Sequence, residues 1–234
     1  MNVYAIADLH LSFSVGPEKS MDMFGNAWVN HAERLKTNWE KIITDDDLVI
    51  MPGDFSWALR LEETGPDFAY FNSLPGKKLM IRGNHDLWWA GVSKMRKMYP
   101  DIVFLQNDSY VPEHEGDTAP FAVIGSRGWL SPGDNEFKED TDRKIYERER
   151  MRLELSFKSL GEAKYDRLIC AIHYPPQGFM DLFEEYHVNN VVYGHLHGEN
   201  AFKNGPEGLI NGIEYRLVSL DRLNCVPQLI MKGV

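Results

Sequence analysis

Residues 78–86 read Lys-Leu-Met-Ile-Arg-Gly-Asn-His-Asp (KLMIRGNHD), a short run that changes abruptly from apolar to polar side chains. The part from Lys78 to Ile81 is nearly continuous in apolar residues, as expected of a strand that is covered on both faces. The motif Gly83-Asn84-His85-Asp86 that follows combines turn-forming residues with side chains that bind metals or transfer protons. Alone, this motif is equally consistent with an ordinary turn, so its interpretation depends on how the other strands end.

Six other short apolar runs are also predicted as strands. They are Val3 to Ala7, Leu48 to Met51, Phe121 to Ile124, Leu168 to Ile172, Val191 to Tyr193 and the less uniform Ile213 to Leu220, expected nearer a sheet edge. Helical patterns lie between several of these runs: Trp28 to Trp39 with Asn26 as N-cap, Asp142 to Leu160, and weaker stretches after Asp86 and Gly178. Polar segments at 11–23, 112–120 and 131–140 are interpreted as loops. Strands alternating with helices predict an α/β fold, and the length favours a single domain over residues 1–234.

The composition limits the class of partner. The chain has 25 basic and 35 acidic residues, for a formal charge of -10. Such a surface repels phosphate backbones and anionic lipids, so we expect no nucleic-acid or membrane partner. Two cysteines provide no disulfide framework, the N-terminus has no signal-peptide pattern, and no apolar stretch approaches the roughly 20 residues that span a bilayer. We therefore expect a cytoplasmic protein, whose oligomeric state the sequence leaves open.

Four more strand ends carry metal-binding side chains. They are Asp8-Leu9-His10, Gly53-Asp54, His173 and Gly194-His195-Leu196-His197. Side chains at i and i+2 of an extended chain point the same way, so the first and last motifs can each present two ligands to one point. Ligand sites in α/β folds cluster beyond the carboxyl ends of strands. Imidazole nitrogen mixed with carboxylate and amide oxygen suits Mn, Fe, Zn, Co or Ni better than Ca or Mg.

Each motif alone has an ordinary explanation. Asp-x-His and Gly-Asp pairs are frequent in loops, and a lone His173 is more often a hydrogen-bonded core histidine than a ligand. The complete set is different, because every motif lies at a strand end and together the motifs supply seven ligand positions. A shared metal site explains the set better than five independent turns do.

This ordered set resembles the motifs of the calcineurin-like metallophosphoesterase superfamily over residues 8–197. The segments Asp54-Phe55-Ser56-Trp57-Ala58 and His85-Asp86-Leu87-Trp88-Trp89 are similar to those of its uncharacterised bacterial predicted phosphohydrolases. The resemblance implies two mixed β-sheets stacked face to face and flanked by helices, with two divalent metal ions, Mn or Fe/Zn being favoured. It also implies that the first metal is held by Asp8, His10 and His197, the second by Asn84, His173 and His195, and that Asp54 bridges them.

Catalytic candidates accompany these ligands. The resemblance implies that His85 contacts the phosphate and assists the leaving group. We expect Asn84 to neutralise charge on the phosphoryl oxygens. Asp86 is either the residue that orients His85 or a simple turn cap. Arg127 and Arg60 are candidates for a cationic phosphate clamp, although a surface salt bridge is an equally good interpretation of either.

One departure from the superfamily is informative. Protein serine/threonine phosphatases usually carry an Asp and an Arg three and four residues after the bridging Asp, where this chain has Trp57 and Ala58. The sequence therefore favours a small substrate over a phosphoprotein. The strand-end tryptophans have two open interpretations, core packing and stacking on a flat group. Arg82 is interpreted as structural.

The predicted function is hydrolysis of a small phosphomonoester or phosphodiester by in-line attack of a hydroxide that bridges the two metal ions. A metal-dependent nuclease or a cyclic-nucleotide phosphodiesterase is the alternative enzyme. A catalytically silent binding scaffold of the same fold is the alternative from another class, although all seven ligand positions retain competent side chains.

Overall fold

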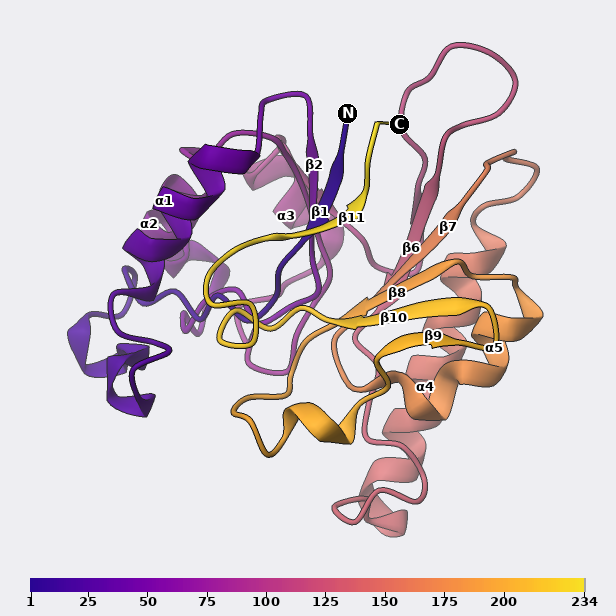
Figure 1. Cartoon of the computed structure of the whole chain (residues 1–234). Coiled ribbons are helices and arrows are strands. Elements are labelled where there is room, and N and C mark those ends of the chain that lie inside the picture. The colour runs from indigo at the N-terminus through magenta and orange to yellow at the C-terminus, as the bar shows by residue number, and fades with distance from the viewer. Residues whose placement is uncertain (234) are drawn as a thin grey trace.

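Two β-sheets stack face to face in the computed structural model, which describes residues 1–233, and helices cover both outer faces (Figure 1). The strand order is β11-β1-β2-β3-β4 in the first sheet and β5-β6-β7-β8-β10-β9 in the second. Parallel pairs form the middle of each sheet, while β11, β5 and β9 run antiparallel at the edges. The prediction of two mixed, stacked sheets flanked by helices is confirmed.

The strand bounds follow the apolar runs closely. The first sheet contains β1 (Val3–Ala5), β2 (Leu48–Met51), β3 (Lys77–Met80), β4 (Ile102–Phe104) and β11 (Gln228–Met231). The second contains β5 (Ser109–Tyr110), β6 (Ala122–Ser126), β7 (Leu168–Ile172), β8 (Asn190–Tyr193), β9 (Gly208–Ile210) and β10 (Ile213–Leu217). The sequence did not predict β4, β5, β9 and β11, which are short and lie at or next to sheet edges.

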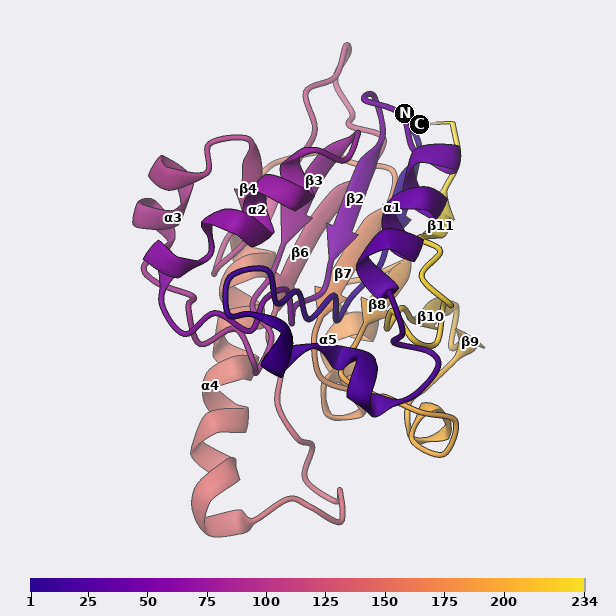
Figure 2. The same ribbon diagram turned by 90° about the vertical axis from the view of Figure 1, so that its left-hand side faces the viewer.

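Within residues 1–233, five α-helices pack on the outside of the sheets. They are α1 (His31–Ile42), α2 (Gly65–Asn72), α3 (Val92–Met98), α4 (Glu139–Lys158) and α5 (Met180–Glu185). Helices α1 to α3 cover the first sheet, and in Figure 2 α1 lies beside β2 while α2 and α3 lie towards β4. Helices α4 and α5 cover the second sheet. None of the helices within residues 1–233 combines the length and apolar character needed to cross a membrane.

The core has three apolar layers, which explains why the strand runs are almost continuously apolar. In β1 and β2, Tyr4 and Val49 face the helices, while their neighbours Val3 and Ile50 face the second sheet. The middle layer joins such side chains to Val123 and others of the second sheet. Both faces of a strand are therefore buried, and alternation is hidden because each face is apolar.

Two local predictions were wrong. Helix α1 begins at His31 rather than near Trp28, and Asn30, not Asn26, occupies its N-cap position with φ of 50°. The ring of His31 contacts the carbonyl oxygens of Trp28 and Leu9 at 3.1 and 3.0 Å, which fixes the start of the helix against the chain after β1. Helix α2 lies in a stretch for which no helix was predicted.

Candidate metal centre

The predicted ligand segments meet at the carboxyl ends of β1, β2, β3, β7 and β8. The backbone joins them directly, because the Asp8 and His10 N–H groups donate to the carbonyls of Gly53 and Asp54, both at 3.0 Å. The His195 N–H donates in turn to the carboxylate of Asp8, at 3.1 Å to Oδ2. Residues far apart in sequence are thus held in one network across both sheets.

Four of these seven side chains lie on backbone with positive φ. The values are 60° for Asp8, 44° for His10, 55° for Asp54 and 72° for His195. Non-glycine residues rarely adopt this region, and such strain is typical of functional sites, where surrounding structure holds it in place. The turns after these strands therefore hold strained backbone conformations, which direct these side chains toward one another.

Glycines allow the close approach of these turns. A Cβ atom on Gly83 would lie 2.1 Å from Oδ1 of Asp54, and one on Gly194 would lie 2.6 Å from Oδ2 of Asp8. Neither position has space for a side chain next to a backbone-fixed carboxylate. The glycine before each of these ligand turns is thus required by packing within the site.

Asp8, His10 and His197 form the first group of potential ligands, with one ligand atom from each within 4.8 Å of the others. The ring of His197 is fixed by Asp221, whose Oδ1 lies 3.1 Å from Nδ1. The Nε2 atom is left facing Asp8 Oδ1 at 4.0 Å. Orientation of a histidine by a carboxylate behind it is a common arrangement at metal sites.

His173, Asn84 and His195 form the second group. Nδ1 of His173 lies 2.9 Å from the Pro52 carbonyl, which requires Nδ1 to carry the proton. Burial lowers the pKa of His173 to about 3, so the ring is neutral and its Nε2 has a free lone pair. That lone pair faces Asn84 Oδ1 at 2.6 Å, and Nδ1 of His195 faces the same oxygen at 2.9 Å.

Asp54 lies between the two groups. Its Oδ2 atom is 3.8 Å from His10 Nε2 and 3.4 Å from His173 Nε2. Its Oδ1 atom accepts a hydrogen bond from the His85 N–H at 2.8 Å. One carboxylate oxygen thus faces a histidine nitrogen of each group.

The residues present fit divalent cations. Burial raises the pKa of Asp8 to about 7 and that of Asp54 to about 6, because no cationic side chain fully compensates these two carboxylates. The neutral Nε2 of His173 also faces only oxygen lone pairs, from Asn84 and Asp54. Nitrogen and oxygen lone pairs that converge without a proton between them match a metal ion.

An apolar cavity of about 500 Å³ opens beside the first group. His10, His197 and His85 line one side of it, and its apolar wall contains Met21, Phe24, Ala27, Trp28 and Trp57. Trp57 stacks on His10 with ring centroids 4.8 Å apart and lies 4.9 Å from the ring of His85. At the position where the protein-phosphatase branch has an acid, this chain thus has an aromatic ring that supports His85.

Asp86 does not contact the His85 ring. Its buried carboxylate accepts hydrogen bonds from the backbone N–H groups of Gly83, Asp54 and Phe55 and from Trp88 Nε1, all between 2.7 and 2.9 Å. Of the two interpretations left open by the sequence, these contacts support the turn-capping one. Asp86 joins the turn after β2 to the turn after β3.

The two arginine candidates lie in different surroundings. Arg127 is mostly buried beside Glu149, at 3.3 Å, and its guanidinium lies over Trp129. Its carbonyl oxygen accepts from the N–H of His173 at 3.1 Å, which places it next to the second group. Arg60 is exposed at the start of the short 3-10 helix Leu61–Glu63, and among residues 1–233 it has no contact with the ligand side chains.

Sequence reasoning missed Asp221 and Tyr174. Asp221 follows the apolar run that ends at Leu220, so it carries the same signal, a polar residue at a strand end, as the predicted ligands. Tyr174 directly follows His173, and its ring lies 4.2 Å from that of His195. The identity of its neighbour gave no indication of this contact, which depends on how β7 and β8 are paired.

Comparison with known proteins agrees with this geometry. The family model for calcineurin-like phosphoesterases matches residues 1–199, which include all seven potential ligands. The chain belongs to the calcineurin-like phosphoesterase family, and Asp221 lies beyond the matched part. Among solved structures, the protein of unknown function AQ665 from Aquifex aeolicus is similar in fold, with a TM-score of 0.53, 17% identity, and coverage of 97% of this chain and 95% of that one. No curated protein sequence matches.

Proposed function

We propose that this chain hydrolyses a small phosphomonoester or phosphodiester with the help of two divalent transition-metal ions. The observation that carries the proposal is the position of Asp54 Oδ2, which faces His10 Nε2 on one side and His173 Nε2 on the other. When bound, a pair of ions would supply an activated water and neutralise charge on the phosphoryl group. The first ion would be held by Asp8, His10 and His197, and the second by Asn84, His173 and His195.

The side chains of this chain would bind and orient the substrate. The exposed ring of His85 lines the mouth of the apolar cavity, where it can reach a bound ester and donate a proton to the leaving oxygen. Its backbone N–H donates to Asp54 and its ring lies against Trp57, so these two residues, rather than a contact with Asp86, orient the ring. Arg127 lies on the side of the second group, where its charge would favour an anionic substrate.

The apolar cavity supports a leaving group that is flat or apolar rather than charged. His85 lies at its edge, so a group protonated by His85 would leave along the wall formed by Phe24 and Trp57. Aromatic walls favour aryl or other planar groups through stacking. A protein segment as leaving group has no support here, in agreement with the absence of the protein-phosphatase residues at Trp57 and Ala58.

Asp54→Asn tests the proposal. Asparagine keeps an oxygen that can accept from the His85 N–H but removes the negative charge between the two groups. Metal content after reconstitution and hydrolysis of an aryl phosphate should fall together, whereas Asp45→Asn, at an exposed carboxylate, should change neither. A variant that keeps two metal equivalents and the full rate would refute the bridging role. Full metal content without turnover in the unmodified chain would favour a binding scaffold.

A further inference from the structure

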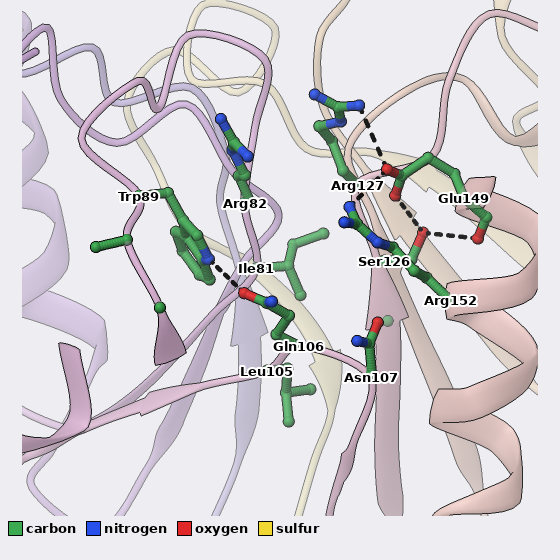
Figure 3. Close-up of a pocket in the computed structure, with 13 residues that line it drawn as sticks. Ile81, Arg82, Trp89, Leu105, Gln106, Asn107, Ser126, Arg127, Glu149 and Arg152 are labelled. Atoms are coloured by element: carbon green, nitrogen blue, oxygen red, sulfur yellow. Dashed lines mark hydrogen bonds and ion pairs between the residues drawn. The ribbon is translucent and has the colours of Figure 1, made fainter. Parts of the chain in front are cut away.

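A second cavity, of about 210 Å³, lies between the two sheets on the side of the second ligand group. Arg82, at the end of β3, lies on one wall, while Arg127 and Arg152 lie on the opposite wall (Figure 3). Arg82 is two residues before Asn84, and Arg127 binds the His173 N–H through its carbonyl oxygen. We call this second cavity the arginine cavity, defined by Arg82, Arg127 and Arg152. Arg82 and Arg127 are thus connected through the backbone to ligand residues of the candidate metal centre.

The arginine cavity is cationic in an otherwise acidic chain. Its only lining carboxylate within residues 1–233 is the fully buried Glu149, which lies 3.3 Å from Arg127 and 2.8 Å from Arg152. One carboxylate for three guanidinium groups leaves a formal charge of 3 − 1 = +2. The nearby Asp108 is not available to compensate it, because it pairs with Arg96. The local charge is therefore opposite in sign to the formal charge of -10 of the whole chain.

Hydrogen-bond donors in the cavity lack acceptors. The Nε atoms of Arg82 and Arg127 are buried and have no partner among the described residues, and Arg82 makes no ion pair within them. Gln106 accepts from Trp89 Nε1 at 2.8 Å, so its amide nitrogen remains as a further donor (Figure 3). Buried donors without acceptors are costly, and guanidinium groups are suited to the paired oxygens of phosphate. The cavity is therefore complementary to an oxyanion.

We propose that the arginine cavity binds a phosphate-type oxyanion other than the phosphoryl group that is cleaved. Its volume lies below the roughly 300–1,000 Å³ of pockets for whole drug-sized ligands, so it suits a single anionic group. The anion has two potential sources, a second phosphate of the substrate or a free anion that regulates the enzyme. Both sources rest on the proposed function, whereas binding of the anion itself does not. Arg82, interpreted from the sequence as structural, would then bind a ligand.

Isothermal titration calorimetry of the metal-free full chain with sulfate tests anion binding by the cavity without any need for turnover. The unmodified chain should bind one equivalent of sulfate. The control Arg148→Gln, at an exposed arginine of helix α4, which also carries Arg152, should bind sulfate equally well. Arg82→Gln and Arg152→Gln should each bind about 10-fold more weakly, as expected for loss of a charged hydrogen bond. Absence of sulfate binding by the unmodified chain, or unchanged affinity in both variants, would overturn the proposal.

Kinetics on the metal-loaded chain then distinguish the sources. If the anion belongs to the substrate, phenyl 3-phosphooxypropyl phosphate should have a higher kcat/KM than phenyl propyl phosphate, because both release phenol and only the first carries a second phosphate. Arg82→Gln should reduce that ratio about 10-fold. If the anion is free, sulfate should alter the kcat for phenyl propyl phosphate in the unmodified chain but not in Arg82→Gln. If the proposed function is wrong, neither ester will be turned over. The sulfate titration will still show whether the arginine cavity binds an anion.

Discussion

Nδ1 of His197 and Oδ1 of Asp221 lie 3.1 Å apart, and this contact orients a potential metal ligand from a residue 24 positions further along the chain. Asp221 also accepts from the Gly198 N–H at 3.0 Å, so it fixes both the ring and the turn that carries it. Burial alone would lower the pKa of His197, but the hydrogen bond to Asp221 and the charge of Asp8 outweigh burial and raise it to about 8. Asp221 therefore belongs to the site as the residue that orients His197.

Asp221→Asn should weaken metal binding about 10- to 100-fold, because the asparagine cannot hold the His197 ring as a charged acceptor does. It can still accept from the Gly198 N–H, so the turn should persist. Glu199→Gln removes an equal charge from an exposed neighbour and serves as the control. Equilibrium titration with Mn should show the loss in Asp221→Asn alone. Equal affinity of both variants would mean that the carboxylate has no orienting role.

Metal affinity should rise steeply with pH. The pKa values of Asp8, about 7, and His197, about 8, are both raised, so the metal-free fold holds protons that a metal must displace. These protonated groups stabilise the metal-free fold at low pH, and that contribution is lost as pH rises through 7 and 8. The increase in Tm caused by Mn should therefore grow between pH 6 and pH 8.5. An increase that is the same at every pH would contradict proton release from these ligands.

Asp86→Ala should lower the free energy of unfolding by about 2–4 kcal/mol, because it leaves buried backbone N–H groups and the Trp88 indole without an acceptor. Urea unfolding of the metal-free chain measures this directly. A role in orienting His85 instead predicts unchanged stability and a lower kcat in the metal-loaded enzyme, and that result would overturn the turn-capping assignment.

Phe24 should determine the preference for aryl esters. Its side chain is 65% exposed yet lines the apolar cavity, so truncation should not disturb the core. Phe24→Ala should reduce kcat/KM for an aryl phosphate about 3- to 10-fold, the range expected for loss of one aromatic contact, while a methyl ester should be unaffected. Met23→Ala, at an exposed neighbour outside the cavity lining, is the control. Equal losses on both esters would show that Phe24 does not bind the leaving group.

Much of this arrangement could be predicted from the sequence because strands covered on both faces give continuous apolar runs. The runs at Leu48 and Leu168 define strands that the structure reproduces residue for residue. Edge strands such as β5, with only two residues, give no such signal and were missed. The start of α1 was misplaced because the tertiary contact of His31 with the Leu9 carbonyl, rather than a local capping pattern, determines it.

The residues of the site show the same distinction between local sequence signals and tertiary contacts. Residues at or just beyond a strand end, such as Asp54 and His173, could be proposed as ligands because all the motifs together share this position. Roles that depend on contacts between distant segments could not. Asp221 reaches His197 from a separate loop, and the cavity around Arg82 exists only because β3, β6 and α4 lie together. Asp86 was ambiguous because a capping carboxylate and an orienting carboxylate have the same sequence pattern.

Metal-dependent hydrolysis is tested by the rate at which the purified chain cleaves an aryl phosphate and an aryl phosphodiester before and after removal of metal. We expect turnover by Mn- or Fe/Zn-loaded protein, its abolition by a chelator, and its return when two equivalents of metal are restored. A chain that holds both metal equivalents and cleaves neither ester, nor any compound in a panel of nucleotides, sugar phosphates and cyclic nucleotides, would contradict it.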